Sequence, residues 1–140
     1  VNGEQIKEFA TYVLIGHSER RQYFKEDDAM LTQKVAMAKK HLLIPVFCVQ
    51  GKDTMVPEGV EIVAYEPIWA IGTGTAELPE EANAVASDVK AKSDVKTVIY
   101  GGSVNAENVA SFTEMDAIDG VLVGSASLKP QEFSQIIQNA

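Results

Sequence analysis

Five short apolar segments constrain the fold of this chain more than any other feature of its sequence. They are rich in β-branched and aromatic residues, they do not alternate with polar residues, and they span residues 12–15, 44–49, 62–65, 97–100 and 121–123. Strands that are apolar on both faces are typical of parallel sheets covered by helices. The sequence therefore predicts five parallel β-strands at these positions.

Longer amphipathic segments alternate with the predicted strands. Asn105 is a candidate N-cap, Pro130 suits a first helical turn, and residues 3–9 predict a short opening helix. Strands that alternate with helices predict an α/β fold with right-handed crossover connections. The apolar side chains at helical spacing are Leu31, Val35, Ala38 and Leu42; Ala82, Val85, Ala86 and Val89; Val109 and Phe112; and Phe133, Ile136 and Ile137.

One connection between predicted strands is too short for an ordinary crossover helix. Only residues 50–60 separate the second strand from the third, and this segment contains Pro57 and Gly59. A parallel crossover needs about a dozen residues, and usually more. We therefore expect at most one helical turn in this connection.

Composition limits the class of protein. The 140 residues suit a single domain, and a hydrophobic fraction of 46% excludes general disorder. A formal net charge of -8 disfavours a nucleic-acid partner. Cys48 is the only cysteine, which excludes a disulfide framework and a multi-cysteine metal site. Because no apolar stretch approaches the roughly 20 residues of a membrane span and residues 1–4 lack a signal-peptide pattern, we expect a cytoplasmic protein without membrane contact.

Polar and small residues follow four of the predicted strands at the points where these strands end. His17 follows the first strand, Glu66 the third, Ser103 the fourth, and Gly124 and Ser125 the fifth. Since parallel strands end at the same edge of a sheet, we expect these residues to converge. A carboxylate beside an imidazole indicates proton transfer, and glycine turns before helices favour a phosphate group.

Each of these residues also has a purely structural interpretation. A histidine after a strand can be a hydrogen-bonded turn residue, and a glutamate before a proline can be solvated. The segment Gly72-Thr73-Gly74 does not complete a dinucleotide-binding motif, and neither serine turn lies in a G-x-S-x-G nucleophile elbow. The pattern thus favours acid–base chemistry over dinucleotide or nucleophilic-serine chemistry.

Four longer motifs carry a resemblance to a known family. They are YVLIGHSERR at residues 12–21, AYEPIWAIGTG at 64–74, YGGSV at 100–104 and DGVLVGSASL at 119–128. In order and approximate spacing they resemble the triosephosphate isomerase family, from its third helix to its eighth. The resemblance covers nearly the whole chain. It implies a TIM barrel that interconverts dihydroxyacetone phosphate and glyceraldehyde 3-phosphate without a cofactor or a metal ion.

The resemblance also implies roles for individual residues. Glu66 is implied as the base, His17 as the group that polarises the substrate carbonyl, and Glu19 as the support of a catalytic lysine. Residues 67–77 are implied to form a lid over the substrate. The sites implied for the phosphate group are Gly72, Ser103, Gly124 and Ser125.

The chain departs from the family in several places. It offers five strands where a complete barrel has eight. The family's first three strands, which carry an asparagine and the catalytic lysine, match nothing in the chain, and no lysine occupies a matching position. The lid hinge, usually Lys-Thr-Ala, reads Thr75-Ala76-Glu77, and Ser125 replaces the second glycine of the final phosphate turn. We therefore predict a partial TIM barrel of about five parallel βα units, forming one domain over residues 1–140.

Three interpretations of function follow from these departures. The first is an isomerase whose missing strands come from another chain or segment. The second is a self-associating partial barrel with little or no activity, and the third is a phosphate-binding module without turnover. We expect severely impaired isomerase activity from the chain alone and weak binding of triose phosphate or phosphate. We also expect a homo-oligomer, because the outer strands and the concave face lack their barrel neighbours.

Overall fold

A single parallel sheet forms the centre of the computed structural model, which describes residues 2–69 and 76–140. Its five strands are hydrogen-bonded in chain order, and every neighbouring pair is parallel. The α/β prediction is confirmed, and the sheet is that of a partial TIM barrel. The strands are β1 (Tyr12–Ile15), β2 (Ile44–Val49), β3 (Ile62–Tyr65), β4 (Thr97–Tyr100) and β5 (Gly120–Val121).

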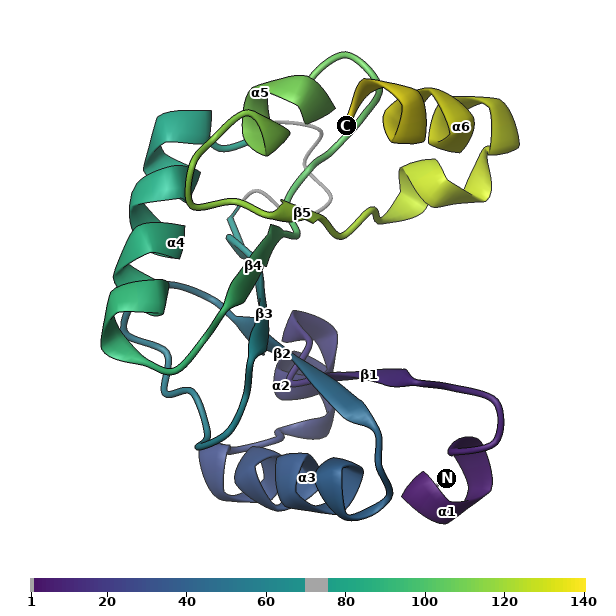
Figure 1. The fold of residues 1–140 in the computed structure, drawn as a ribbon, viewed down its shortest axis with the longest axis vertical. Helices are drawn as coiled ribbons and strands as arrows, with labels where there is room; N and C mark the ends of the chain where they lie inside the picture. Colours follow the sequence, from purple (N-terminus) through teal and green to yellow (C-terminus); the bar gives the residue numbers. More distant parts are fainter. Residues whose placement is uncertain (1, 70–75) are drawn as a thin grey trace.

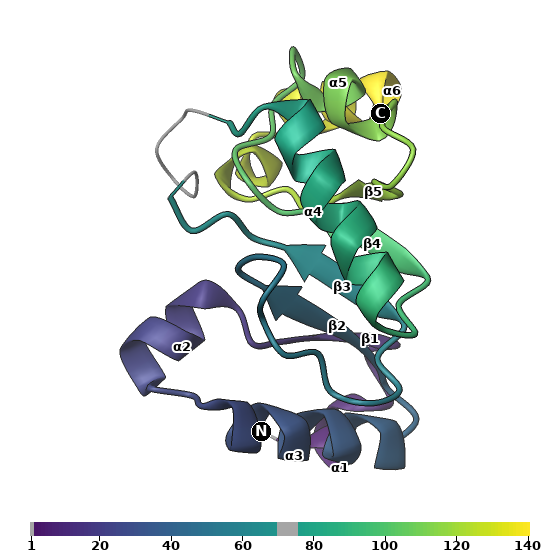
Figure 2. The ribbon, with the colours of Figure 1, turned by 90° about the vertical axis from the view of Figure 1, so that its left-hand side faces the viewer.

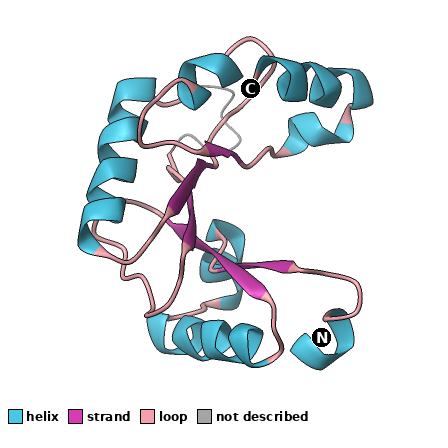
Figure 3. Ribbon diagram, in the orientation of Figure 1, coloured by secondary structure: helices cyan, strands magenta, loops and turns pink. Residues whose placement is uncertain are grey.

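Helices cover the outer side of this curved sheet, as Figures 1 and 3 show. Helix α3 packs against β1 and β2, α4 against β4, and α5 against β5, while α1 and α6 lie near opposite ends of the arc. Figure 2 shows α3 and α4 from the side. The helices are α1 (Gly3–Ile6), α2 (Ser18–Phe24), α3 (Asp28–Lys40), α4 (Pro79–Lys92), α5 (Val109–Thr113) and α6 (Pro130–Asn139), with a 3₁₀ turn η1 (Ser125–Leu128).

The predicted element boundaries hold for the first four strands and fail in a few other places. Strand β5 ends at Val121 rather than at residue 123, although the Leu122 amide still donates to the Tyr100 carbonyl at 2.8 Å. Helix α1 ends at Ile6 because the chain turns there toward β1. Asn105 caps the turn before α5 rather than α5 itself, since its side chain accepts from the Glu107 and Asn108 amides.

Two further differences concern the ends of helices α2 and α3. Helix α2 lacks the apolar periodicity that signals a helix, and His17 caps its first turn. Leu42 is wrong as a core residue of α3, because the chain reverses there with φ +61° and leaves the side chain 90% exposed. This reversal follows the cap at His41 and brings Ile44 into β2.

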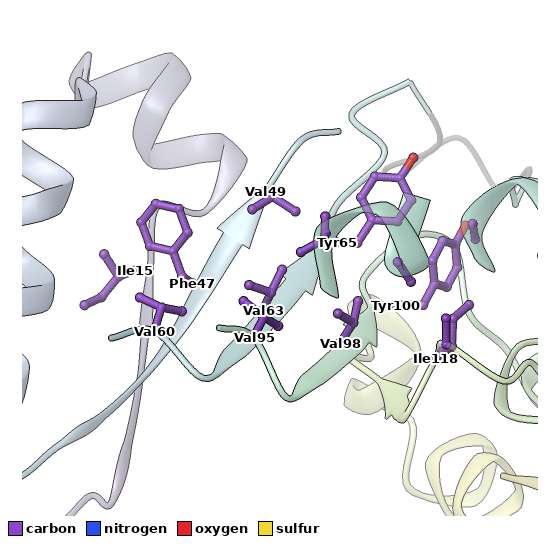
Figure 4. Close-up of a cluster of buried hydrophobic side chains, with 14 of the residues drawn as sticks. Ile15, Phe47, Val49, Val60, Val63, Tyr65, Val95, Val98, Tyr100 and Ile118 are labelled. Atoms are coloured by element: carbon purple, nitrogen blue, oxygen red, sulfur yellow. The ribbon is translucent and has the colours of Figure 1, made fainter. Parts of the chain in front are cut away.

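The convex face of the sheet carries the main hydrophobic core. Phe47, Val63, Val98 and Tyr100 point to this face and are completely buried. Figure 4 shows them in a row with residues from the loops that lead into the next strands. Tyr100 also stacks on Phe112 of α5, with 4.0 Å between ring centroids. The core therefore lies between the sheet and its outer helices.

The concave face is covered only in its middle. Val46, Cys48 and Ala64 are buried there and pack together, as the in-register pairing of β2 with β3 requires. Toward the β1 edge, however, Tyr12 is 58% exposed and Leu14 is 46% exposed. Apolar side chains at the β1 end of this face thus meet solvent.

The short connection between β2 and β3 contains turns and no helix, as predicted. The Thr54 hydroxyl accepts from the Gln50 amide at 3.0 Å, and Val60 is buried in the convex core. A loop therefore occupies the position of a crossover helix. Among the helices of the described residues, none has both the length and the apolar character that a membrane crossing requires.

Candidate active site

Two side chains predicted from separate strands meet at the carboxyl edge of the sheet. His17 follows β1 through Gly16, whose φ of +83° lies in the left-handed region that favours glycine. Glu66 follows β3, and its amide donates to the Val49 carbonyl at 2.8 Å. His17 Nε2 lies 3.1 Å from Glu66 Oε1. The sequence prediction that these two residues converge is thus met by the geometry.

The hydrogen bonds of His17 define which ring nitrogen carries the proton. The Glu19 amide donates to Nδ1 at 3.3 Å, so Nδ1 bears a lone pair. In an imidazole with one N–H the proton then resides on Nε2, which lies 3.1 Å from Glu66 Oε1. This arrangement presents an N–H donor to any group that replaces the Glu66 carboxylate.

Glu66 is buried, and both oxygens of its carboxyl group have a polar partner. The residue is 1% exposed, and its second oxygen accepts from the Ser18 amide at 3.0 Å. Burial raises the pKa of the carboxyl, while His17 and the Ser18 amide act in the opposite direction. A carboxyl with a raised pKa is a stronger base when ionised, as a group that removes a proton from carbon must be.

A cavity of about 580 Å³ extends from this pair along the carboxyl ends of β4 and β5. His17, Glu66, Ser103, Gly124 and Ser125 all line it, together with Glu19. Ser103 is half-buried, and its carbonyl accepts from Asn108 at 2.9 Å. Gly124 and Ser125 are exposed at the start of η1. The structure therefore gathers six of the seven predicted site residues, and the seventh, Gly72, lies outside the described residues.

Glu19 contributes to the site through its backbone. Its side chain is exposed at the rim of the cavity, whereas its amide fixes the imidazole of His17. Support of a lysine by the Glu19 carboxylate remains a prediction.

Arg21 supports the turn that carries His17, a role that the sequence analysis did not single out. Its guanidinium donates to the Gly16 carbonyl at 2.8 Å and to the Cys48 carbonyl at 3.2 Å. It also lies over the Phe47 ring. These contacts tie the turn that carries His17 to β2. The available signal was the position of Arg21 in the first turns after His17, where a partly buried arginine needs hydrogen-bond partners.

Among the described residues, no group of three or more His, Cys, Asp or Glu side chains is arranged to hold a metal ion. Cys48 is buried, and burial raises the pKa of its thiol, so it is packed as an uncharged side chain.

The sequence of the chain is similar to known sequences along its whole length. The family described as "Triosephosphate isomerase" matches residues 1–61 and 54–140 of this chain. The chain belongs to the triosephosphate isomerase family. Triosephosphate isomerase of Mesomycoplasma hyopneumoniae (strain 7448) is 41% identical over 162 aligned positions, which cover 100% of this chain and 67% of the relative. That of Dictyoglomus thermophilum is 40% identical, covering 92% and 65%.

The extent of these alignments bears on the fold. The chain spans about two thirds of the length of the relatives it matches, consistent with the carboxyl-terminal portion of the family. The alignment with the Mesomycoplasma isomerase has 162 positions, 22 more than the 140 residues of this chain. The family match also breaks and overlaps at residues 54–61, within the helix-free connection between β2 and β3. The break in the family match and the helix-free connection thus fall at the same place in the chain.

Proposed function

We propose that the chain carries the acid–base residues of a triosephosphate isomerase, which interconverts dihydroxyacetone phosphate and glyceraldehyde 3-phosphate. The observation that carries this proposal is the 3.1 Å pair of His17 Nε2 and Glu66 Oε1, in a cavity that continues to Ser103 and Ser125. One end of the cavity thus offers a base and an N–H donor. The other offers small-residue turns suited to a phosphate group.

The proton transfer requires the substrate to separate His17 from Glu66. The carbonyl oxygen of the substrate accepts the Nε2 proton of His17 as a hydrogen bond. The Glu66 carboxylate then removes a proton from the adjacent carbon, and the electrons of the broken C–H bond form the enediolate. His17 gives its Nε2 proton to the former carbonyl oxygen and takes the proton of the neighbouring hydroxyl group, which becomes the new carbonyl. Return of the proton from Glu66 to the former carbonyl carbon completes the isomerisation and restores both residues, with no net change in charge.

We propose that the chain alone performs this reaction with little or no efficiency. The catalytic lysine and asparagine implied by the family resemblance have no counterpart in the sequence. Preorganised charge of this kind contributes several kcal/mol to catalysis, so its loss lowers the rate by about three decades or more. We also expect phosphate binding to be weak, because the net charge of -8 on the chain repels an anion.

The experiment measures deuterium uptake by dihydroxyacetone phosphate in D₂O, which detects proton transfer even when turnover is slow. We expect slow uptake that Glu66→Gln abolishes, because the amide cannot act as a base. Turnover by the 140-residue chain at the rate of a full-length relative would refute the proposed impairment. Uptake that Glu66→Gln leaves unchanged would refute the role of Glu66.

A second candidate function is a self-associating, non-catalytic phosphate-binding fragment. The observation that favours it is the exposed apolar surface around Tyr12 and Leu14, beside the unpaired edge of β1. Burying several hundred Å² of such surface contributes on the order of 10 kcal/mol before association costs. Sedimentation equilibrium at micromolar concentration tests this: we expect a homo-oligomer, and a compact 15.1 kDa monomer with cooperative unfolding would exclude it.

A further inference from the structure

The cavity at the carboxyl edge of the sheet has an unfavourable charge balance for a phosphate ester. Three carboxylates line it: Glu19, Glu66 and Glu132. Lys129 is the one lysine or arginine among the described residues of the lining. A phosphate dianion that enters this cavity is repelled by the carboxylates, and Lys129 is the side chain that can offset the repulsion.

Lys129 has a fixed backbone and a movable side chain. It lies between η1 and α6, where its amide donates to the Ala126 carbonyl at 3.2 Å and its carbonyl accepts from the Phe133 amide at 2.9 Å. Its ammonium group, in contrast, is exposed, and within the part of the chain that the structure describes it forms an ion pair with the Glu132 carboxylate at 3.0 Å. Lys129 lies four residues after Ser125 in the sequence. Because its backbone is held and its ammonium group is exposed, the side chain can change partner without a movement of the backbone.

We propose that Lys129 is a phosphate-binding residue of this chain and that Glu132 competes with the phosphate group for its ammonium. In the unliganded site Lys129 pairs with Glu132. When a phosphate monoester occupies the turn at Ser125, the ammonium moves to the phosphate oxygens. This inference rests on the proposed function, because it takes a phosphate group in this cavity as the ligand.

The competition gives the two partners opposite effects on affinity. Lys129→Gln removes the attraction and weakens phosphate binding. Glu132→Gln frees the ammonium, removes one repulsive charge and strengthens phosphate binding. A residue that served only to hold η1 against α6 would show the same sign for both substitutions, because either one breaks the same ion pair.

The chain offers a matched control pair at the amino ends of the strands, on the side of the sheet opposite to the cavity. Lys96 and Glu61 form an ion pair of 3.1 Å, and the two lysines are similarly exposed, at 71% for Lys96 and 73% for Lys129. Both control residues directly precede strands, β4 and β3, so they lie at the amino ends, away from the cavity. Lys96→Gln and Glu61→Gln change the net charge by the same amounts as the test variants.

The experiment titrates each variant with inorganic phosphate at constant ionic strength and follows the amide signals of Gly124 and Ser125 by NMR. We expect Lys129→Gln to weaken binding about fivefold, Lys129→Arg to restore most of it, and Glu132→Gln to tighten it about twofold. We expect both control variants to stay within about 1.5-fold of the unmodified chain.

Two results would overturn the inference, and they are distinguishable from failure of the proposed function. If the unmodified chain binds phosphate and Lys129→Gln equals Lys96→Gln, Lys129 is not a phosphate-binding residue although the phosphate site stands. If Glu132→Gln weakens binding, the competition is wrong. If millimolar phosphate leaves the amide signals of the unmodified chain unchanged, the phosphate site itself is refuted, and the inference falls with it.

Discussion

The convex and concave faces of the sheet are built from the same short strands but differ in what covers them. On the convex face, Phe47 and Val98 are completely buried beneath helices and loops. On the concave face, Tyr12 and Leu14 are about half exposed at the β1 edge. The contrast is sharpest within β1, where Ile15 is buried and its neighbour Leu14 is not. An apolar strand residue therefore indicates the need for a cover, and toward the β1 edge the described residues cover only the convex face.

The prediction with the largest expected effect compares one apolar strand residue from each face. We expect Phe47→Ala to lower the free energy of unfolding by about 3–5 kcal/mol, because it leaves a cavity in the convex core. Leu14→Ala removes a half-exposed side chain, so we expect a loss of about 1 kcal/mol or less in the monomer. Urea unfolding at low protein concentration measures both. Equal losses would mean that the concave face is as well packed as the convex face.

A second test addresses what covers the concave face. We expect Tyr12→Asp to raise the dissociation constant for self-association by about tenfold or more, since it places a charge on the uncovered apolar surface. Tyr23→Asp is the matched control: this tyrosine is 69% exposed on α2, outside the sheet. Sedimentation equilibrium of the two variants makes the comparison. If both have the same dissociation constant, the concave face does not form the interface.

The third test uses the two buried carboxyls that follow β3. Glu66 opens on the concave cavity, where its Oε1 lies 3.1 Å from His17 Nε2 and its Oε2 accepts from the Ser18 amide. Glu77 lies at the convex core, where its Oε1 accepts from the Tyr65 hydroxyl at 3.1 Å and its Oε2 has no hydrogen-bond partner among the described residues. Burial raises the pKa of Glu77, the Tyr65 hydroxyl opposes this shift, and Glu81 adds to it.

The raised pKa of Glu77 predicts the sign of a pH effect. The folded chain holds the Glu77 proton more tightly than the unfolded chain, so this group contributes stability at low pH that is lost as pH rises above about 4.5 through the folded pKa. The quantity of interest is the free energy of unfolding of Glu77→Gln minus that of the unmodified chain. We expect this difference to be higher at neutral pH than at pH 4 by about 1 kcal/mol. The measurement is the difference between the two unfolding profiles against pH. A difference that does not vary with pH would contradict the assignment.

The sequence predicted the strands better than it predicted their faces. The runs at 12–15, 44–49, 62–65 and 97–100 were found residue for residue, because parallel strands are continuously apolar. The same property hides which side each residue faces, so the exposure of Leu14 could not be read from its neighbours. The prediction for the fifth strand ran too far, to residue 123. The strand ends at Val121, which pairs with Tyr100, the last residue of β4, although the apolar run continues.

The sequence pointed to candidate site residues where a reactive side chain directly follows a strand. His17 and Glu66 were found in this way, and their 3.1 Å contact follows from parallel strand ends. Two residues were missed: Lys129, which lines the cavity, and Arg21, which holds the turn before His17. Both lie on elements after the strands, and the direction of their long side chains depends on packing. Their contributions depend on tertiary contacts that no local pattern encodes.

The helix-free connection between β2 and β3 changes the order in which the chain can assemble. Val46 pairs with Ile62, 16 residues later, whereas Tyr12 pairs with Ile44 across 32 residues and Ile62 with Thr97 across 35. The entropy lost on closing a loop grows with its length, and local contacts speed folding. We expect the β2–β3 pair to form first in the folding of the chain, so that Val63→Ala slows refolding while Val13→Ala chiefly speeds unfolding in stopped-flow measurements. Loss of the crossover helix would thus give this sheet a nucleation point at its second and third strands.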